Sequence, residues 1–342
     1  MKNKKDLKNF SLSELEVFLV ANGFSKYRAV QVYGWAFKDV EKFEDMKNLP
    51  PNLIKFLSEN FYINRFKVLK KQTSKDGTIK FLFSLDDENT IECVLMKYAY
   101  GYSICISTQV GCRMNCKFCA STTGGLVRNL TSGEMIEEVM AVSRETGKTI
   151  SNIVLMGIGE PFDNYKEVMK FVHGINSPYG FNIGMRHITI STSGLVPKIY
   201  EFADEKTQCN LAVSLHSAID SVRSQLMPIN KKYNIESLIK ACKYYCSKTN
   251  RRISFEYALI NGVNDKVSDA EALSSLIKNM LCYVNLIPLN YVAGKGLSKS
   301  KDSSIDLFKN ILRKNKIPMT VRRELGQDID GACGQLRIKE KL

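Results

Sequence analysis

The sequence predicts an α/β protein whose main domain is an incomplete barrel of six β/α units. From Tyr102 onward, apolar or β-branched runs alternate with helical stretches, at residues 103–108, 151–157, 186–192, 210–216, 253–259 and 283–289. This alternation is typical of a parallel sheet with right-handed crossovers. Residues 317–322 are a candidate for one further strand.

Several of these runs alternate apolar and small polar residues, although a parallel strand covered on both faces is nearly all aliphatic. In the first run, Ile104 and Ile106 share one face, whereas Cys105 and two serines share the other. An ordinary eight-stranded barrel fills its interior with Val, Ile and Leu, so a polar inner face favours a partial, TIM-like (β/α)6 barrel that holds a polar ligand. An open sheet with one wet face is the alternative, which the helix after each strand disfavours.

The N-terminal part is predicted to be a small helical domain. The pairs Ser11 with Glu14 and Ser13 with Glu16 each fit a capping box, and Gly23 fits a helix end. Residues 66–97 follow as a short antiparallel β extension with turns at 75–77 and 86–89. We therefore expect four parts: a helical domain at 1–65, a β extension or linker at 66–97, a core at 98–327 and a tail at 328–342.

Composition restricts the class of protein. No apolar run reaches the roughly 18 to 20 residues of a membrane span, and the N-terminus has no apolar signal stretch, so we expect a cytoplasmic protein. Ten cysteines in a chain of 342 residues without an export signal favour reduced thiols, metal ligands or catalytic groups over disulfides. The net charge of +14 favours a polyanion such as RNA, although surplus lysine also serves as a solubilising surface.

Three cysteines directly follow the first predicted core strand, where a barrel has its active-site loops. Cys112, Cys116 and Cys119 have the spacing Cys-x3-Cys-x2-Cys. Three thiolates can bind three irons of a 4Fe-4S cluster, whereas the usual electron-transfer cluster has four cysteine ligands. The open iron can chelate S-adenosylmethionine, whose carbon–sulfur bond breaks on receiving one electron. The alternative is a zinc site, which normally requires four ligands and often a second Cys-x2-Cys pair that this chain lacks.

Eight segments, the first of which contains the cysteine motif, carry a likeness that covers essentially the whole chain. They are STQVGCRMNCKFCAS (107–121), which contains the motif, and then GGLVRNLTSGEM (124–135), VLMGIGEPFDN (154–164), ITISTSGLVP (188–197), AVSLHS (212–217), LMPINKKYNI (226–235), VNLIPLN (284–290) and DIDGACGQL (328–336). With this set the sequence resembles the radical S-adenosylmethionine superfamily, and within it the RNA adenine-C2 methyltransferases, the family of large-subunit ribosomal RNA methyltransferase N.

The resemblance implies a mechanism with two molecules of S-adenosylmethionine per turnover. One methylates Cys333, and the other yields a 5′-deoxyadenosyl radical that takes hydrogen from the methylated sulfur. The carbon radical then adds to adenine, Glu92 accepts a proton, and Cys105 releases the protein–RNA intermediate as a transient disulfide with Cys333. Without the resemblance, Cys105 would be interpreted as a small buried hydrophobe and Glu92 as a solvent-facing carboxylate opposite Ile91 and Cys93.

The resemblance also implies a set of cofactor contacts. Gly159 and Glu160 match the pair that meets the amino group of S-adenosylmethionine. Further matching positions, all at the ends of predicted strands, are Ser191, Ser214, Leu215, His216 and Asn290. A lone histidine is usually a satisfied core residue, so a structural role for His216 is the alternative.

The partners that the resemblance implies are 23S ribosomal RNA, tRNA and an electron donor such as flavodoxin or ferredoxin. A recessed adenine must be flipped from its stack to enter a pocket. Basic residues near the motif loops are candidates for phosphate contacts or simple surface charges: Arg113, Lys117, Arg128, Lys231, Lys232, Arg322 and Arg323. In the N-terminal domain, which matches the family's RNA-engaging domain, Trp35, Tyr27 and Phe37 are expected to be core residues rather than stacking platforms.

Two alternatives remain at this point. The sister C8-specific methyltransferases of 23S ribosomal RNA, which confer antibiotic resistance, share the cysteine chemistry, and only the closer likeness of TQVGCRMNC and GGLVRNL to the C2 pattern favours C2. A non-catalytic iron–sulfur or zinc RNA-binding protein is the second alternative, against which Cys333 and the Gly-Glu pair argue.

Overall fold

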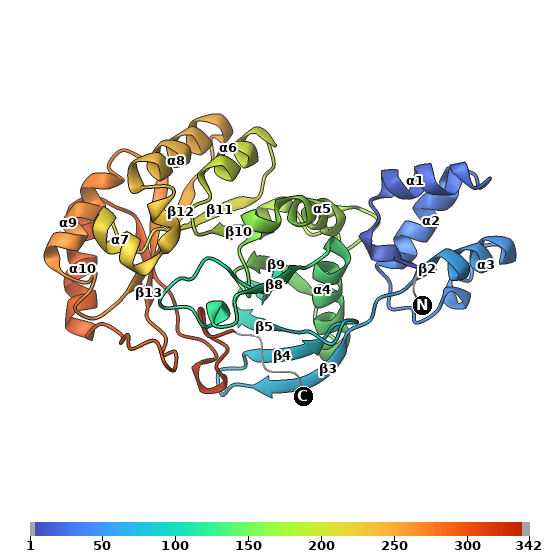
Figure 1. The fold of residues 1–342 in the computed structure, drawn as a ribbon, viewed down its shortest axis with the longest axis horizontal. Helices are drawn as coiled ribbons and strands as arrows, with labels where there is room; N and C mark the ends of the chain where they lie inside the picture. The colour runs from blue at the N-terminus through green and yellow to red at the C-terminus, as the bar shows by residue number, and fades with distance from the viewer. Residues whose placement is uncertain (1–3, 337–342) are drawn as a thin grey trace.

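The computed structural model describes residues 4–336, which form a long curved sheet flanked by helices, with a small helical domain at one end (Figure 1). Within these residues the main sheet has ten strands in the order β14-β13-β12-β11-β10-β9-β6-β5-β4-β3. Its strands are β3 (Lys67–Thr73), β4 (Ile79–Ser84), β5 (Thr90–Tyr98), β6 (Gly101–Cys105), β9 (Ile150–Leu155), β10 (Ile188–Thr192), β11 (Asn210–Ser214), β12 (Ile253–Leu259), β13 (Cys282–Pro288) and β14 (Met319–Val321).

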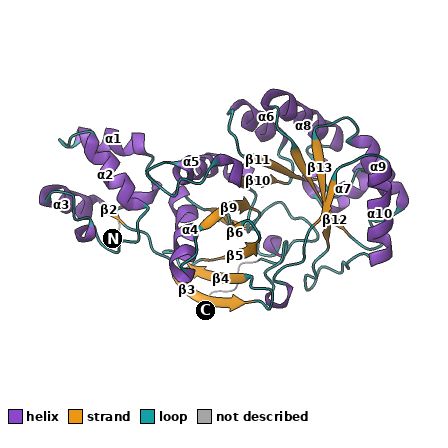
Figure 2. Ribbon diagram, turned by 180° about the vertical axis from the view of Figure 1, so that it is seen from behind, coloured by secondary structure: helices purple, strands orange, loops and turns teal. Residues whose placement is uncertain are grey.

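The six predicted core strands are β6, β9, β10, β11, β12 and β13, and all pair in parallel with their neighbours in this run. The candidate seventh strand is β14, which continues the parallel order. Helices cover the outer face of the sheet (Figure 2). They are α4 (Ser132–Thr146), α5 (Tyr165–Asn176), α6 (Val196–Asp204), α7 (Asp220–Leu226), α8 (Ile235–Thr249), α9 (Val267–Leu276) and α10 (Asp302–Lys314). The predicted fold class, a partial barrel with a radical-enzyme type of core, is confirmed.

The predicted antiparallel extension is continuous with this sheet. Strands β3, β4 and β5 form a meander, and β5 pairs antiparallel with β6. One face of β5 packs through Ile91 and Cys93 into the core that also contains Met135 and Val139 of α4. Its other face packs with Leu336 of the C-terminal segment, so β5 is buried on both faces.

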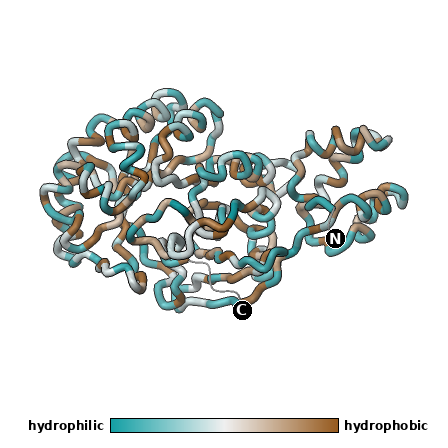
Figure 3. Tube along the Cα trace, in the orientation of Figure 1, coloured by the Kyte–Doolittle hydropathy of each residue, from teal (hydrophilic) through white to brown (hydrophobic). Residues whose placement is uncertain are grey.

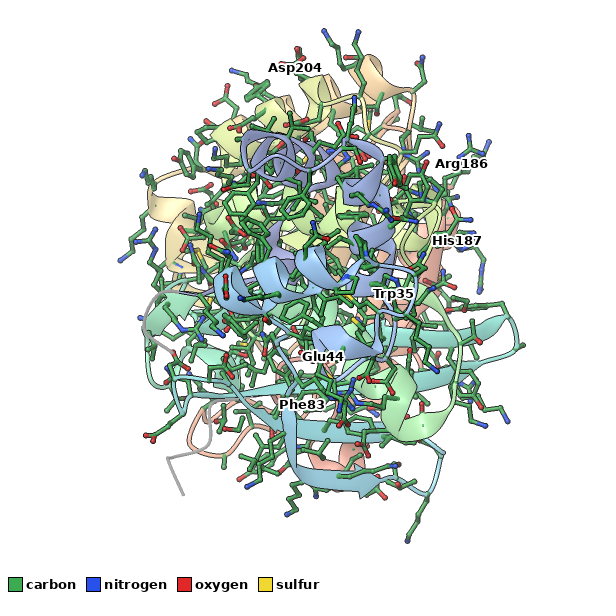
Figure 4. All side chains as sticks on the ribbon, turned by 90° about the vertical axis from the view of Figure 1, so that its right-hand side faces the viewer. Trp35, Glu44, Phe83, Arg186, His187 and Asp204 are labelled. Carbon is green, nitrogen blue, oxygen red and sulfur yellow. The ribbon has the colours of Figure 1, made fainter. Side chains whose placement is uncertain are left out.

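The N-terminal helices α1 (Leu12–Ala21), α2 (Tyr27–Ala36) and α3 (Pro51–Asn60) have a hydrophobic core of their own. The capping box of Ser11 with Glu14 opens α1 as predicted. Two short strands, β1 (Lys5–Asp6) and β2 (Phe61–Tyr62), pair in parallel at the base of the domain. Figure 3 shows hydrophobic segments of the chain along the main sheet and in these helices. In Figure 4, Trp35 lies in this domain, in front of the sheet that carries Phe83.

A further small sheet completes the fold. A hairpin of β7 (Gln109–Gly111) and β8 (Leu126–Asn129) frames the loop that carries the three cysteines. Among residues 4–336, no helix is both long and apolar enough to span a membrane. The predicted tail at 328–342 lies within the described residues only as far as Leu336.

Candidate active site

Most of the predicted site residues line one cavity of about 1010 Å³ at the carboxyl ends of the parallel strands. All three cysteines of the Cys-x3-Cys-x2-Cys motif line it, together with Cys333 of the C-terminal segment. The predicted cofactor residues that line the same cavity are Gly159, Glu160, Ser191, Ser214, His216 and Asn290. The polar inner face predicted from the strand pattern is therefore the wall of this cavity.

The cysteine loop is held by backbone hydrogen bonds and by a left-handed residue. The Cys112 N–H donates to the Gly125 carbonyl at 2.8 Å, and Asn115 has φ +55°. Burial raises the pKa of Cys112 to about 12 and raises the pKa of Cys116 well above that of a free thiol. Two buried thiols and the partly buried Cys119 beside one cavity therefore fit a positively charged group that would hold them as thiolates.

The arrangement fits a cluster better than a single ion. Among residues 4–336, no three His, Cys, Asp or Glu side chains converge on a point where one metal ion could bind. In a 4Fe-4S cluster each cysteine binds a different iron, so the three sulfurs do not need to converge on one point. Cys112, Cys116 and Cys119 would hold three irons, and the fourth would face the cavity.

The loop after β9 depends on glycine. Gly159 has φ +114°, and a Cβ there would lie 2.7 Å from Cβ of Gln109 and 2.8 Å from Oγ1 of Thr108. The next residue, Glu160, is buried, and its carboxylate accepts hydrogen bonds from the N–H groups of Ser193 at 2.7 Å and Phe162 at 3.0 Å. These bonds orient an anionic acceptor at the cavity wall, although burial raises its pKa.

The sequence allowed His216 to be either a cofactor contact or a buried structural residue, and its position fits both. It is buried with φ +55°, and its Nδ1 accepts the Ala258 N–H at 2.9 Å. Burial lowers the pKa of His216 to about 3, so the ring is neutral. With Nδ1 as an acceptor, the proton is assigned to Nε2, which makes this ring a hydrogen-bond donor in a wall of the cavity.

The side chain of Leu215 lies apart from the other predicted cofactor residues. Its side chain is fully buried in the hydrophobic core and does not line the cavity. Its N–H donates a hydrogen bond to the Glu256 carbonyl at 3.0 Å, and its carbonyl accepts a hydrogen bond from the Nε–H of Arg223 at 3.1 Å. The side chain therefore points away from the cavity because strand side chains alternate between the two faces.

Arg223 was not predicted, and it organises two strand ends. Its fully buried guanidinium donates to the carbonyls of Ser193 at 2.7 Å, Ser214 at 3.1 Å and Leu215 at 3.1 Å, and to Oδ1 of Asn230 at 2.7 Å. These bonds place β10 and β11 relative to each other at the cavity. From the sequence, an arginine in a short helix is indistinguishable from a surface charge.

Cys333 is exposed and is placed by the loops around it. Nδ2 of Asn290 donates to its carbonyl at 3.0 Å, and the Ala120 N–H, next to the last cluster cysteine, donates to the Gly334 carbonyl at 2.8 Å. Oγ of Ser121 donates to the Leu336 carbonyl at 2.6 Å. The cysteine loop and the C-terminal segment are therefore joined directly.

Cys333 also lines a second cavity of about 580 Å³, which contains Cys105 and Arg322. Burial and the nearby Cys333 raise the pKa of Cys105 to about 12, against the lowering effect of Arg322. Arg322 lines both cavities. The position of Cys105 on the polar inner face is as predicted, whereas Arg322, a candidate for phosphate contacts, lines the cavity that contains both thiols.

Comparison with known proteins identifies the family. Residues 5–63 match the family model of the ribosomal RNA large subunit methyltransferase N-terminal domain, and residues 106–273 match that of the radical SAM superfamily. A curated protein of Caldanaerobacter subterraneus subsp. tengcongensis, "Probable dual-specificity RNA methyltransferase RlmN", is 55% identical over 98% of both chains. A protein of the same name from Clostridium perfringens is 53% identical over 98% of this chain and 99% of its own.

The chain belongs to the RlmN family.

A solved relative agrees with this assignment. The crystal structure of a radical SAM methyltransferase from Sphaerobacter thermophilus is 44% identical and superposes with a TM-score of 0.92, over 97% of this chain and 99% of that chain. As an RlmN-type radical SAM RNA methyltransferase, the protein is a transferase, and its superfamily implies a 4Fe-4S cluster and S-adenosylmethionine. Family membership excludes the non-catalytic RNA-binding alternative.

Glu92 departs from its interpretation as a surface carboxylate. On β5 of this RlmN-type enzyme its side chain is only 1% exposed, and it pairs with Lys80 of β4 at 3.4 Å. It does not line either of the two cavities described here. The sequence could not show this burial, because the C-terminal segment that covers β5 is more than two hundred residues away in the chain.

Two of the candidate phosphate contacts are already paired with acidic side chains. Arg113 forms an ion pair with Asp163, and Arg128 forms pairs with Asp87 at 2.6 Å and with Glu134 at 2.8 Å.

Tyr27 also differs from expectation. It is 56% exposed rather than a core residue. Trp35 and Phe37 pack against the N-terminal core as expected.

Proposed function

We propose that this enzyme forms 2-methyladenosine at an adenosine in the peptidyl-transferase centre of 23S ribosomal RNA and at the adenosine 3′ of the anticodon in tRNA. The dual-specificity name of its relatives supports two substrates. The observation that carries the proposal is the position of Cys333, which borders both the cavity of the cluster cysteines and the cavity of Cys105. The enzyme works in the cytoplasm, where its RNA substrates are.

The target carbon explains the need for radical chemistry. C2 of adenine lies between two ring nitrogens and is electron-poor, so it is a weak nucleophile toward a methyl sulfonium. A cluster held by Cys112, Cys116 and Cys119 would supply the electron needed to cleave S-adenosylmethionine into methionine and a carbon radical able to take a hydrogen atom. The protein must then hold the carbon that reacts, and a sulfur within reach of both cavities can do so.

The protein residues divide the remaining steps. The sulfur of Cys333 accepts a methyl group, loses one hydrogen atom from it, and presents the resulting carbon radical to C2. The adduct loses its C2 proton to Glu92, and the one electron released would be taken up by the cluster that Cys112, Cys116 and Cys119 would hold. Cys105 attacks the sulfur of Cys333, so that a disulfide bond forms, the carbon–sulfur bond breaks, and the carbon takes a proton. A donor such as flavodoxin or ferredoxin supplies the electrons, including two that reduce the disulfide.

The cofactor is held at the strand ends. Glu160 would accept a hydrogen bond from the amino group of S-adenosylmethionine, and Gly159 would allow the cofactor to approach the backbone closely. Ser191, Ser214 and neutral His216 would complete the polar wall. Asn290 already donates to the Cys333 carbonyl, so it would link the cofactor to the methyl acceptor.

Analysis of RNA tests the product. Mass spectrometry of ribosomal RNA and tRNA, from cells with and without the gene, should show loss of 2-methyladenosine from both when the gene is deleted. Loss of 8-methyladenosine instead would identify the C8-specific alternative. An unchanged tRNA would restrict the substrate to the ribosome.

Replacing the second thiol tests its role. Cys105→Ala should stop turnover after the carbon–carbon bond forms, because no thiol remains to break the bond between Cys333 and carbon. A covalent protein–RNA adduct through Cys333 should accumulate and be visible as a shifted band on a denaturing gel. Cys93→Ala is the matched control, since Cys93 lies on the neighbouring strand and faces the hydrophobic core. Normal turnover by Cys105→Ala would exclude Cys105 from the mechanism.

A further inference from the structure

Lys80 is a buried cation that contacts both Glu92 and the C-terminal segment. Its ammonium lies 3.4 Å from Oε1 of Glu92 and donates to the carbonyl of Asp330, three residues before Cys333, at 3.1 Å. The side chains of Lys80 and Glu92 are only 3% and 1% exposed. A buried ion pair gains little net stability over an apolar pair of similar size, because both charges lose their hydration. A functional reason for this pair is therefore worth testing.

The register of the sheet puts the pair on the inner face. Glu92 is opposite Leu82, and Lys80 is opposite Val94, so the lysine and the carboxylate are diagonal neighbours on one face. Val94 is also opposite Cys105 on the other side. Because residues opposite each other share a face, Lys80 and Glu92 belong to the same face of the sheet as Val94 and Cys105, which line the second cavity.

The turn before Lys80 binds the same C-terminal segment. The Gly326 N–H donates to Oδ2 of Asp76 at 2.8 Å, and the Lys75 N–H donates to Oδ2 of Asp328 at 3.2 Å. With the lysine bond to Asp330, three contacts join the β3–β4 turn and β4 to residues 326–330. The base of the segment that carries the methyl-accepting thiol is thus anchored beside Glu92.

We propose that Lys80 is a positioning residue for methyl transfer: it holds the carboxylate of Glu92 in place and ties this base to the segment that carries Cys333. The inference rests on the proposed function, in which Glu92 accepts the C2 proton. A buried carboxylate has lost its hydration, and the ammonium of Lys80 is the cation that compensates its charge at 3.4 Å. Without that cation the carboxylate would lose both its position and its link to the C-terminal segment.

The step itself is a proton transfer. In the oxidised adduct the bond between C2 and hydrogen breaks, its electron pair stays in the ring and restores aromaticity, and the proton goes to an oxygen of Glu92. Lys80 keeps its own proton throughout. It acts through the charge and position of Glu92 and does not touch the RNA.

The experiment follows the C2 hydrogen in the trapped adduct. All variants are made in the reconstituted Cys105→Ala enzyme, with RNA that carries deuterium at C2 of the target adenine, and adducts are analysed by mass spectrometry. The Cys105→Ala parent should give an adduct without deuterium. Adding Lys80→Met should leave deuterium in the adduct, with loss slowed about tenfold or more, because the buried base loses the cation that holds it in place. Lys80→Arg keeps the cation and should restore loss, and Lys70→Met, on the exposed edge strand β3, should match the parent.

The outcomes separate this inference from the proposed function. Deuterium loss by Lys80→Met at the parent rate would overturn the role of Lys80. If Lys80→Met forms no adduct, Lys80→Arg decides: loss at the parent rate supports the inference, and retention contradicts it. Loss at the parent rate by Glu92→Gln would remove the base from the proposed function itself, whereas no adduct in the Cys105→Ala parent would remove the thiol mechanism.

Discussion

Single side chains set the protonation state of the groups that react. A thiolate rather than a thiol is the nucleophile in methyl transfer and in disulfide formation. Burial raises the pKa of Cys105 to about 12, and Arg322 acts against that rise. The two thiols and this guanidinium line one cavity, and Arg322 is the residue that favours the thiolate form of Cys105 there.

If the proposed function holds, we expect Arg322 to control the release of the RNA from the protein. The pKa of Cys105 is well above neutral, so between pH 7 and pH 9 its thiolate fraction rises about tenfold with each pH unit. We expect the rate of release of the adduct to rise by the same factor. Arg322→Met should raise the pKa of Cys105 further and slow release at every pH, whereas Arg322→Lys should keep most of the rate. The measurement is the decay of isolated wild-type and variant adducts at set pH values. A pH-independent decay, or equal rates for Arg322→Met and wild type, would contradict this account.

The elements of the fold were predictable where local pattern decides them. The six core strands follow from runs that alternate apolar and small polar residues, because the inner face meets a cavity and the outer face meets helices. Cys105 could be placed on the inner face for the same reason. Glu92 could not, since its strand has the same alternation and only the distant C-terminal segment determines what covers it. Arg128 shows the same limit, because its partners Asp87 and Glu134 come from other elements.

The junction between the N-terminal helices and the core also depends on contacts that no local pattern reveals. Lys8, in the short helix η1 (Leu7–Asn9), forms an ion pair with Glu137 of α4, and both side chains are almost completely buried. Glu137 also accepts the Phe66 N–H at 3.2 Å and Arg144 at 2.9 Å. One carboxylate thus joins the helical domain, the start of β3 and the core.

Breaking this junction should destabilise the protein. Lys8→Met leaves Glu137 with one fewer cation in a dry site and should lower the free energy of unfolding by about 3 kcal/mol, the range seen when one partner of a buried pair is removed. Denaturant unfolding measures it. Lys26→Met, which removes an exposed pair with Glu16, should change stability by less than about 1 kcal/mol. Equal effects of the two substitutions would show that the buried pair does not hold the domains together.

At the scale of the whole molecule, the chain combines a small helical domain, an open β/α barrel and a C-terminal segment that crosses the barrel. The sequence predicted these parts and their order, because each has its own composition and motifs. It could not predict that the β extension and the C-terminal segment enclose the active site together. That closure brings Cys333 beside the cluster cysteines on one side and Cys105 on the other.

The central claim is that the methyl group passes through Cys333 as a carbon radical, and an isotope experiment tests it most directly. Reconstituted enzyme is given reductant, RNA and S-adenosylmethionine with a fully deuterated methyl group, and the products are analysed by mass spectrometry. The deuterated methyl group on Cys333 should lose one deuterium atom to the 5′-deoxyadenosyl radical and later take up one solvent proton. We therefore expect 2-methyladenosine with two deuterium atoms and 5′-deoxyadenosine with one. A product methyl that keeps all three deuterium atoms, with none in 5′-deoxyadenosine, would contradict the account.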